Sequence, residues 1–225
     1  MADLPTNSRR AAGTANEAQV PESGFETPMT ALNRLPPTPD PGVVHVVVES
    51  PRGATTKIKY DEQLQVFTVS RPLPLGLAYP HDWGFVPGTR AEDGDPLDAL
   101  VLSEGTTFPG MVLRARPIAV VKLEQDAKPG ASFGAKSTGK GPKGRTRRER
   151  NDRLVAVLDN APRSDARTLA DIPRRVRQEI ERFFMDSTFF EHKNAQVLGW
   201  DGPQAALALV TSARQKRRRR REGRS

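Results

Sequence analysis

Apolar and polar residues alternate along the middle of the chain. The alternation predicts strands at VVHVVVES (43–50), in IKYDEQLQVFTVS (58–70), at DALVLSE (98–104), at MVLRARPIAVVKLE (111–124) and at RLVAVLDN (153–160). The second stretch predicts two strands, because residues 61–63 interrupt it as a turn. Five or more short strands separated by turn residues are typical of a small β-barrel or a β-sandwich.

The pattern changes to helical spacing near the C-terminus. Residues 171–190 repeat apolar side chains every three or four positions, which predicts a helix with Asp171 as N-cap and Pro173 in its first turn. Residues 203–217 predict a second helix. Residues 71–89 are rich in Pro and Gly, which favours ordered loop and short extended pieces over helix. The chain as a whole predicts a β-barrel core with two C-terminal helices packed against it.

Two basic segments, residues 128–150 and 214–225, account for the net positive charge of the chain. Each has eight Lys or Arg residues against one Glu, a net +7, so with +8 for the whole chain the remainder is mildly acidic at −6. Such segments cannot bury apolar surface, and we expect them to be solvated and to bind polyanions non-specifically. We expect a disordered arm at 1–41, a folded domain at 42–213 with a flexible basic insertion at 127–150, and a disordered polybasic tail at 214–225.

The composition excludes several classes of protein. The chain has no cysteine, which excludes disulfides, thiolate metal sites and a cysteine nucleophile. Its apolar runs are far too short to cross a bilayer, and its first residues lack the pattern of a secretory signal. We therefore expect a cytoplasmic protein without membrane contact.

The stretch RAEDGDPLDALVL (90–102) places Asp93, Asp95 and Asp98 within six positions. Alternation puts Asp93 and Asp95 on one side of an extended segment, and Gly94 and Pro96 allow a bend that brings in Asp98. Three neighbouring carboxylates raise one another's pKa unless a cation neutralises them. Oxygen ligands without Cys or a His cluster favour Mg²⁺ or Mn²⁺ over zinc.

Two other interpretations of this stretch stay open at this point. One is an Asp-rich turn that caps its own backbone. The other is an EF-hand calcium loop, which is disfavoured because Asp98 stands where that loop needs glycine. The upstream residues Glu49, Lys59, Arg71 and Tyr79, at strand ends or in Pro/Gly-rich loops, favour a metal site. Carboxylates beside cations and a hydroxyl are typical of phosphate transfer or hydrolysis.

At this point the sequence resembles the soluble inorganic pyrophosphatases that have an oligonucleotide-binding (OB)-like barrel. The resemblance covers about residues 43–210, and DGDPLD (93–98) is its most specific part. The matching stretches are VVVESPRG (46–53), KYD (59–61), SRPLPLGLAYPHDWGFVPGT (70–89), EDGDPLDALVL (92–102), FPG (108–110), RPIAVVK (116–122), RLVAV (153–157), ERFF (181–184) and GW (199–200). The resemblance implies an α+β, mainly β fold, with a five-stranded OB-like closed barrel and two C-terminal helices.

The resemblance also implies an activity and its residues. The activity is hydrolysis of pyrophosphate to two orthophosphates with several Mg²⁺ ions, for which Mn²⁺ is a substitute, in a homo-oligomer that is a hexamer or a dimer. Asp93 and Asp98 would bind two activating metals, Asp95 would orient and deprotonate the water between them, and Glu49 would hold a further metal. The expected phosphate contacts are Lys59, Arg71, Tyr79 and Arg153, the last at a position where the family has a lysine.

The chain departs from the family pattern at several metal and aromatic positions. Asp61 replaces a family Glu, and Trp83 replaces a tyrosine. Two further metal-binding aspartates of the family align with Gln125 and Asn151. The neighbouring residues are Asp126 and Asp152, so a one-residue shift beside the basic insertion would restore both carboxylates. On that basis we expect Asp126 and Asp152 as metal ligands.

A phosphate-binding Tyr-Lys pair of the family aligns with Ser187 and Thr188. Their hydroxyl groups can hydrogen-bond but supply no positive charge. An arginine of the insertion, such as Arg147, Arg148 or Arg150, is one source of compensation. Because that charge is missing, two other functions stay open: hydrolysis of a larger phosphoanhydride, and a weakened or inactive homologue that binds RNA, polyphosphate or another acidic partner through the basic segments.

Overall fold

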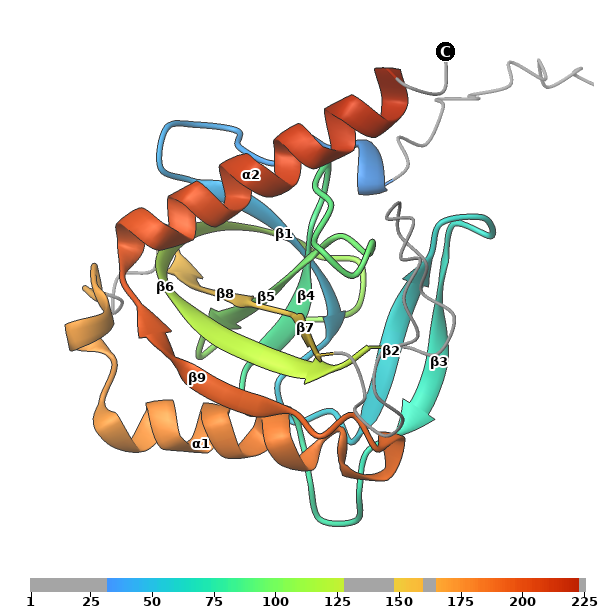
Figure 1. Ribbon diagram of the computed structural model, residues 1–225, viewed down its shortest axis with the longest axis vertical. Helices are drawn as coiled ribbons and strands as arrows, with labels where there is room; N and C mark the ends of the chain where they lie inside the picture. The colour runs from blue at the N-terminus through green and yellow to red at the C-terminus, as the bar shows by residue number, and fades with distance from the viewer. Residues whose placement is uncertain (1–31, 128–147, 160–164, 223–225) are drawn as a thin grey trace, which may run out of the picture.

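The strands form one mixed sheet and a separate hairpin (Figure 1). The computed structural model describes residues 32–127, 148–159 and 165–222. The strands of the sheet are β1 (Val44–Ser50), β4 (Asp82–Val86), β5 (Leu97–Leu102), β6 (Val112–Asp126), β7 (Arg148–Arg150), β8 (Arg153–Leu158) and β9 (Gln196–Asp201). The hairpin consists of β2 (Thr56–Asp61) and β3 (Val66–Pro72). The expected mainly β architecture is confirmed.

The long strand β6 connects the sheet, because it pairs antiparallel with β1, β7, β8 and β9. The other pairings join β1 to β4 and β4 to β5 in antiparallel fashion, and β5 to β8 in parallel. The order β1, β4, β5, β8, β6 thus returns to β1. In this order β4 lies between β1 and β5, and Phe85 stands opposite both Val47 and Asp98.

Strand β4 lies within the Pro/Gly-rich stretch, where only short extended pieces were expected. A glycine makes its pairing with β1 possible. A Cβ atom on Gly84 would lie 1.9 Å from the carbonyl oxygen of Val47, so any side chain would push the two backbones apart. Strand β9 was not expected at all; it pairs with β6 from Val120 to Glu124, with a register shift beside Gly199.

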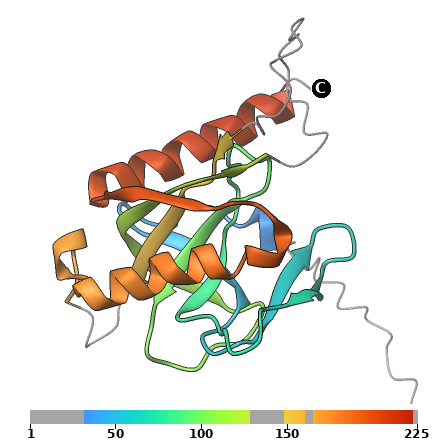
Figure 2. The ribbon, with the colours of Figure 1, turned by 60° about the horizontal axis from the view of Figure 1, so that its bottom comes forward.

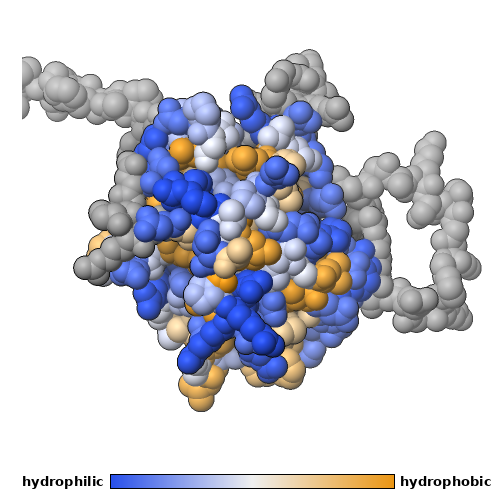
Figure 3. Space-filling model, turned by 90° about the vertical axis from the view of Figure 1, so that its left-hand side faces the viewer, coloured by the Kyte–Doolittle hydropathy of each residue, from blue (hydrophilic) through white to orange (hydrophobic). Residues whose placement is uncertain are grey.

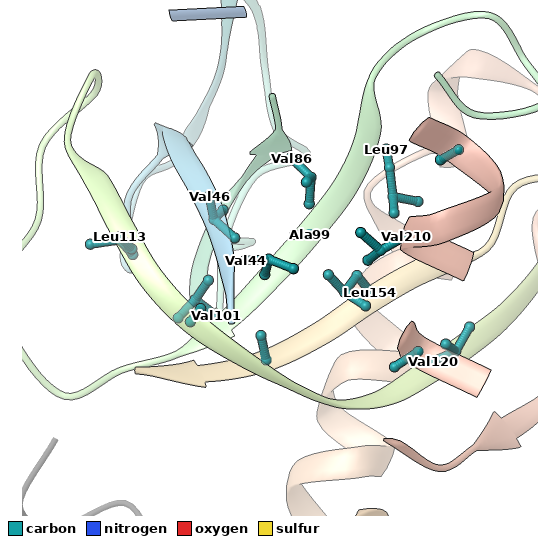
Figure 4. Close-up of a cluster of buried hydrophobic side chains, with 14 of the residues drawn as sticks. Val44, Val46, Val86, Leu97, Ala99, Val101, Leu113, Val120, Leu154 and Val210 are labelled. Carbon is teal, nitrogen blue, oxygen red and sulfur yellow. The ribbon is translucent and has the colours of Figure 1, made fainter. Parts of the chain in front are cut away.

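Buried side chains form two clusters on the two faces of the strands. Alternate residues of β5 face opposite ways, so that Ala99 and Val101 belong to the first cluster and Leu100 to the second. Helix α2 (Pro203–Glu222) closes the first cluster with Ala206 and Val210 (Figure 4). Helix α1 (Arg174–Asp186) closes the second with its buried residues Ile180, Phe183 and Phe184. The two helices lie on opposite sides of the sheet, as expected for helices packed on the β core (Figure 2).

The start of α1 differs from the prediction. Its N-cap is Pro173, and Asp171 instead ends the short 3-10 helix η2 (Leu169–Asp171). The Asp171 carboxylate accepts hydrogen bonds from the backbone N–H groups of Arg167 (2.9 Å) and Thr168 (2.8 Å). An aspartate side chain accepts hydrogen bonds from the nearest unpaired backbone N–H groups, which here precede η2 and do not belong to the first turn of α1.

Some segment boundaries also differ from those expected. Residues 32–41, expected in the N-terminal arm, lie on the folded body: they include the 3-10 helix η1 (Leu32–Arg34), and Pro37 accepts a backbone hydrogen bond from His45 (3.0 Å). The expected basic insertion contributes β7 to the sheet, and α2 continues beyond residue 213 through Glu222. The expectations of a disordered arm, a flexible insertion and a disordered tail fall largely on residues 1–31, 128–147 and 223–225, which lie outside the described residues.

Hydrophilic residues cover much of the face that is on the left in Figure 1, with several separate hydrophobic patches between them (Figure 3). Among the helices of the described residues, none has the length and apolar character needed to cross a membrane.

Candidate active site

The loop between β4 and β5 carries Asp93 and Asp95. Thr89 fixes this loop, because its hydroxyl donates to the carbonyl of Val86 (2.5 Å) and accepts from the N–H of Leu97 (3.0 Å). Asp93 Oδ1 accepts the N–H of Asp95 (3.1 Å), which is the self-capping expected of an Asp-rich turn. That bond uses one oxygen of one aspartate, so self-capping does not explain the other two.

Glu49 brings a fourth carboxylate to the aspartates. It lies near the end of β1, is 5% exposed, and accepts a hydrogen bond from the N–H of Tyr60 (2.9 Å). Burial raises its pKa to about 7, the Tyr60 hydrogen bond partly opposes this, and the nearby charge of Asp98 raises it further. Burial, followed by the charge of Asp98, also raises the pKa of Asp93. These groups are therefore ionised only at an electrostatic cost.

A cavity of about 150 Å³ lies beside Glu49, Asp95 and Asp98. We call it the carboxylate cavity; its lining includes Glu49, Lys59, Asp95 and Asp98. Lys59 Nζ lies 3.7 Å from Asp95 Oδ2, and each side chain is 45% exposed. Burial alone would lower the pKa of Lys59, but the carboxylates, Asp95 foremost, outweigh it and raise that pKa.

Arg153 lies at the edge of the carboxylate cavity, at the start of β8. Its guanidinium pairs with Asp98 and lies 5.4 Å from the centroid of the Trp83 ring. Its Nε is buried and has no hydrogen-bond partner within the described part of the chain. Arg153 therefore keeps a free donor beside the carboxylates, and Trp83 retains an aromatic face for a cation to lie on.

A second cavity, of about 50 Å³, adjoins Arg153. We call it the cationic cavity, because four cationic side chains line it: Lys57, Arg71, Arg153 and Lys193. Tyr79 also lines it and packs on Phe183, with ring centroids 4.9 Å apart. Burial raises the pKa of Tyr79 to about 12, so its hydroxyl stays protonated and can donate a hydrogen bond.

Lys57 and Lys193 are the site residues that the sequence reasoning missed. Lys57 had a recognisable signal, because it stands two positions before Lys59 on the same strand, and alternate residues of a regular strand lie on one side. Lys193 lies between two short elements and carries no such signal. Burial, as the first cause, lowers the pKa of Lys57 to about 8.

Ser187 and Thr188 also line the cationic cavity, but their hydroxyls close the end of α1. Ser187 Oγ donates to the carbonyl of Phe184 (3.5 Å), and Thr188 Oγ1 donates to the same oxygen (3.3 Å). Neither residue brings positive charge to the cavity.

The structure does not bring Asp126 and Asp152 to the other carboxylates. Asp126 accepts hydrogen bonds from Arg148 (3.0 Å) and Asn194 (2.5 Å). Asp152 Oδ1 accepts from the N–H of Leu123 (3.0 Å) and from Arg150 (2.7 Å). These pairs also engage Arg148 and Arg150, two of the arginines considered as sources of compensating charge.

Gln125 and Asn151 are buried where the family has carboxylates. Gln125 lines the cationic cavity, and since neighbouring residues of a strand face opposite sides, Asp126 is directed elsewhere. Asn151 Oδ1 is buried without a hydrogen-bond partner among the described residues. Asp61, the shortened family Glu, accepts the N–H groups of Gln63 (2.8 Å) and Leu64 (2.9 Å) and so shapes the β2–β3 turn.

The donor set suits a hard divalent cation, because carboxylate oxygens are the ligands that such ions prefer. The raised pKa values of Glu49 and Asp93 indicate repulsion and burial that a cation would offset. Over the described ranges, however, no three His, Cys, Asp or Glu side chains are grouped closely enough to hold an ion as they stand. Asp95 and Asp98 are turned toward Lys59 and Arg153, so binding of an ion requires these pairs to open.

The comparisons with known proteins agree with one another and cover most of the chain. The family model described as inorganic pyrophosphatase matches residues 46–218. A curated inorganic pyrophosphatase of Nostoc is 34% identical over 180 residues, which cover 80% of this chain and 94% of that protein. The corresponding protein of Thermus thermophilus is 36% identical over 174 residues, covering 76% and 87%.

Solved structures show the same similarity. The crystal structure of inorganic pyrophosphatase from Thermus thermophilus superposes with a TM-score of 0.71 at 32% identity, over 84% of this chain and 99% of that one. An inorganic pyrophosphatase from Neisseria gonorrhoeae gives a TM-score of 0.68 at 27% identity, over 83% and 99%. The structural similarity therefore extends over most of the chain.

Proposed function

The chain belongs to the inorganic pyrophosphatase family, and we propose that it hydrolyses pyrophosphate to two orthophosphates. The observation that carries this proposal is the adjacency of the two cavities, which the Arg153–Asp98 pair joins. Carboxylates for cations lie on one side of the pair, and cations for phosphate oxygens lie on the other. A diphosphate with bound divalent cations needs both sets of groups together.

We infer Mg²⁺ as the metal, with Mn²⁺ as a substitute, held by Glu49, Asp93 and Asp98. When bound, such an ion lowers the pKa of water and neutralises phosphate charge. Asp126 and Asp152 are left out of the inferred ligand set, because their oxygens are already paired with Arg148 and Arg150. The buried orphan oxygen of Asn151 replaces a carboxylate at its aligned position without the charge.

The residues of the chain act on water and on the substrate. Asp95 would orient the attacking water and take its proton on the carboxylate once its pair with Lys59 opens. The guanidinium groups of Arg71 and Arg153, with the Lys59 ammonium, would bind phosphate oxygens. The protonated hydroxyl of Tyr79 would donate a further hydrogen bond.

Three finer points accompany this proposal. The return of the pairing order to β1 supports a five-stranded closed barrel of OB type. The family resemblance supports a homo-oligomer, hexamer or dimer, in the cytoplasm. Non-specific binding of polyanions by residues 128–150 and 214–225 is supported by their positive charge. The comparisons favour neither a larger phosphoanhydride as substrate nor a purely binding role.

The test is orthophosphate release from pyrophosphate with and without Mg²⁺, comparing the wild-type chain with Asp95→Asn. We expect Mg²⁺-dependent turnover that falls by at least about a hundredfold in the variant, the order of the loss of a general base. Asp201→Asn is a matched control, because Asp201 pairs with Lys122 (2.9 Å) outside both cavities. Background turnover in the wild type, or equal turnover in Asp95→Asn, would refute the proposal.

A further inference from the structure

The cationic cavity contains more positive charge than the family resemblance assigns to it. Lys57 enters from β2, and Lys193 enters from the segment between the 3-10 helix η3 (Phe189–Glu191) and β9. Lys57 and Lys59 both lie on β2 but line different cavities, Lys57 the cationic and Lys59 the carboxylate cavity, and the pairing of β2 with β3 has a register shift between Lys57 and Ile58. Strand β2 therefore presents one lysine to each half of the site.

These lysines line the cavity in which Ser187 and Thr188 align with the phosphate-binding Tyr-Lys pair of the family, where the positive charge of that pair is missing. Ser187 and Thr188, which line the same cavity, use their hydroxyls on the carbonyl of Phe184. Arg148 and Arg150 are paired with acidic residues outside the cavity. Among the described residues, the positive groups that line this cavity are Lys57, Arg71, Arg153 and Lys193, and Arg153 is paired with Asp98.

A carboxylate of the chain already contacts two of these cations. Glu191 pairs with Arg71 through one oxygen and with Lys193 through the other. Glu191 Oε1 has no aligned hydrogen bond among the described groups, and Arg71 Nη2 donates instead to the carbonyl of Ser187 (2.7 Å). Lys193 hydrogen-bonds the Glu191 carboxylate, whereas the contact of Oε1 with Arg71 is an ion pair without an aligned hydrogen bond, so a stronger anion could replace it.

The cationic cavity is small, with a volume of about 50 Å³. Glu191 does not line it, but Glu191 pairs with two of the cations that do, Arg71 and Lys193, so displacement of this carboxylate would free both.

We propose that Lys57 and Lys193 bind a phosphate group of the substrate together with Arg71, and that the Glu191 carboxylate neutralises Arg71 and Lys193 until the substrate displaces it. The inference rests on the proposed function, because it names further substrate-binding residues of the same site.

Two measurements test the lysines. The first is kcat/KM for pyrophosphate, and the second is calorimetric binding of methylenediphosphonate, which cannot be hydrolysed. Lys57→Gln and Lys193→Gln should each lower kcat/KM and the affinity for the diphosphonate by about ten- to a hundredfold, the effect of one lost charge-assisted contact. Lys122→Gln is the matched control, because that lysine pairs with Asp201 outside the cavity, and it should change both by less than about twofold.

Glu191→Gln tests the displaced anion. It should tighten diphosphonate binding by about two- to fivefold, because one competing ion pair is gone. Unchanged or weaker binding would overturn the role of Glu191, and wild-type behaviour of both lysine variants would overturn the subsite. If the wild type did not hydrolyse pyrophosphate, the proposed function would fall, whereas the diphosphonate titrations would still decide whether Lys57 and Lys193 bind a diphosphate; absence of diphosphonate binding would overturn the subsite as well.

Discussion

The guanidinium of Arg153 pairs with the carboxylate of Asp98 at the boundary between the carboxylate and cationic cavities. Both partners are needed elsewhere in the proposed reaction, Asp98 for a divalent cation and Arg153 for a phosphate oxygen. In the proposed reaction, binding of metal and substrate would therefore exchange this pair for two others, Asp98 with the cation and Arg153 with the phosphate.

Replacement of Arg153 by Gln should separate these two roles. We expect kcat/KM for pyrophosphate to fall by about ten- to a hundredfold, because a charge-assisted phosphate contact is lost. The affinity for Mg²⁺ without substrate should rise, because Asp98 loses a competing cation. Trp83, 5.4 Å from the guanidinium, offers a fluorescence signal for the Mg²⁺ titration. Arg114→Gln, which affects an exposed pair with Asp40, is the control, and a weaker Mg²⁺ affinity in Arg153→Gln would contradict the expectation.

Asp93→Asn should raise the stability of the metal-free protein and reduce the stabilisation that added Mg²⁺ provides. Burial and the charge of Asp98 raise the pKa of Asp93, so its ionised form destabilises the metal-free fold. The amide keeps an oxygen to accept the N–H of Asp95 but removes the charge. We expect a higher melting temperature than wild type in EDTA and a smaller rise when Mg²⁺ is added, since only the native state binds the ion. Equal Mg²⁺-induced rises in both proteins would remove Asp93 from the metal site.

The order of chemical groups along the chain was sufficient to indicate several residues that lie together in the fold. Asp95, Asp98, Glu49 and Lys59 line one cavity in the structure, and their roles there stay predictions. The register beside the insertion could not be predicted, because Gln125 and Asp126 are sequence neighbours and only the strand pairing decides which one faces the site.

Elements without a periodic signal were predicted only coarsely or missed. Strand β4 lies in a stretch whose Pro and Gly residues indicated loop and short extended pieces, and Gly84 is there because two strands approach closely. Lys193 lines the cationic cavity from a segment without regular spacing, and only the folded chain brings it and Glu191 together with Arg71. Local patterns report local structure, whereas these contacts depend on the tertiary fold.

Gly84→Ala should destabilise the fold strongly. The added methyl group would lie 1.9 Å from the backbone oxygen of Val47, which cannot rotate away as a side chain would. We expect a loss of at least about 1–3 kcal/mol in the free energy of unfolding, the range for overpacked interiors, measured by urea denaturation. Gly105→Ala is the control, because nothing lies within 4 Å of its added Cβ. Equal stability of the two variants would show that β1 and β4 can separate freely.

His81 should make the fold sensitive to acid. Its Nδ1 is buried without a hydrogen-bond partner among the described residues, and burial, followed by the charge of Arg52, lowers its pKa below the ordinary 6.5. Asp82 and Glu179 oppose this shift but do not reverse it. The unfolded chain therefore binds a proton at His81 more readily than the folded chain does.

The sign of the pH effect follows from that difference. The neutral imidazole costs no stability above pH 6.5, and stability is lost as the pH falls from about 6.5 toward the lower pKa of the folded state. In His81→Gln, the decrease in the free energy of unfolding between pH 7 and pH 5, measured by urea denaturation at about these values, should be smaller than in wild type. Carboxylates titrate in both proteins, so the comparison isolates the histidine. His45→Gln is the control; it removes a ring whose Nδ1 lies 2.8 Å from the carbonyl oxygen of Pro36. A parallel decrease in wild type, His81→Gln and His45→Gln would exclude His81 as the cause.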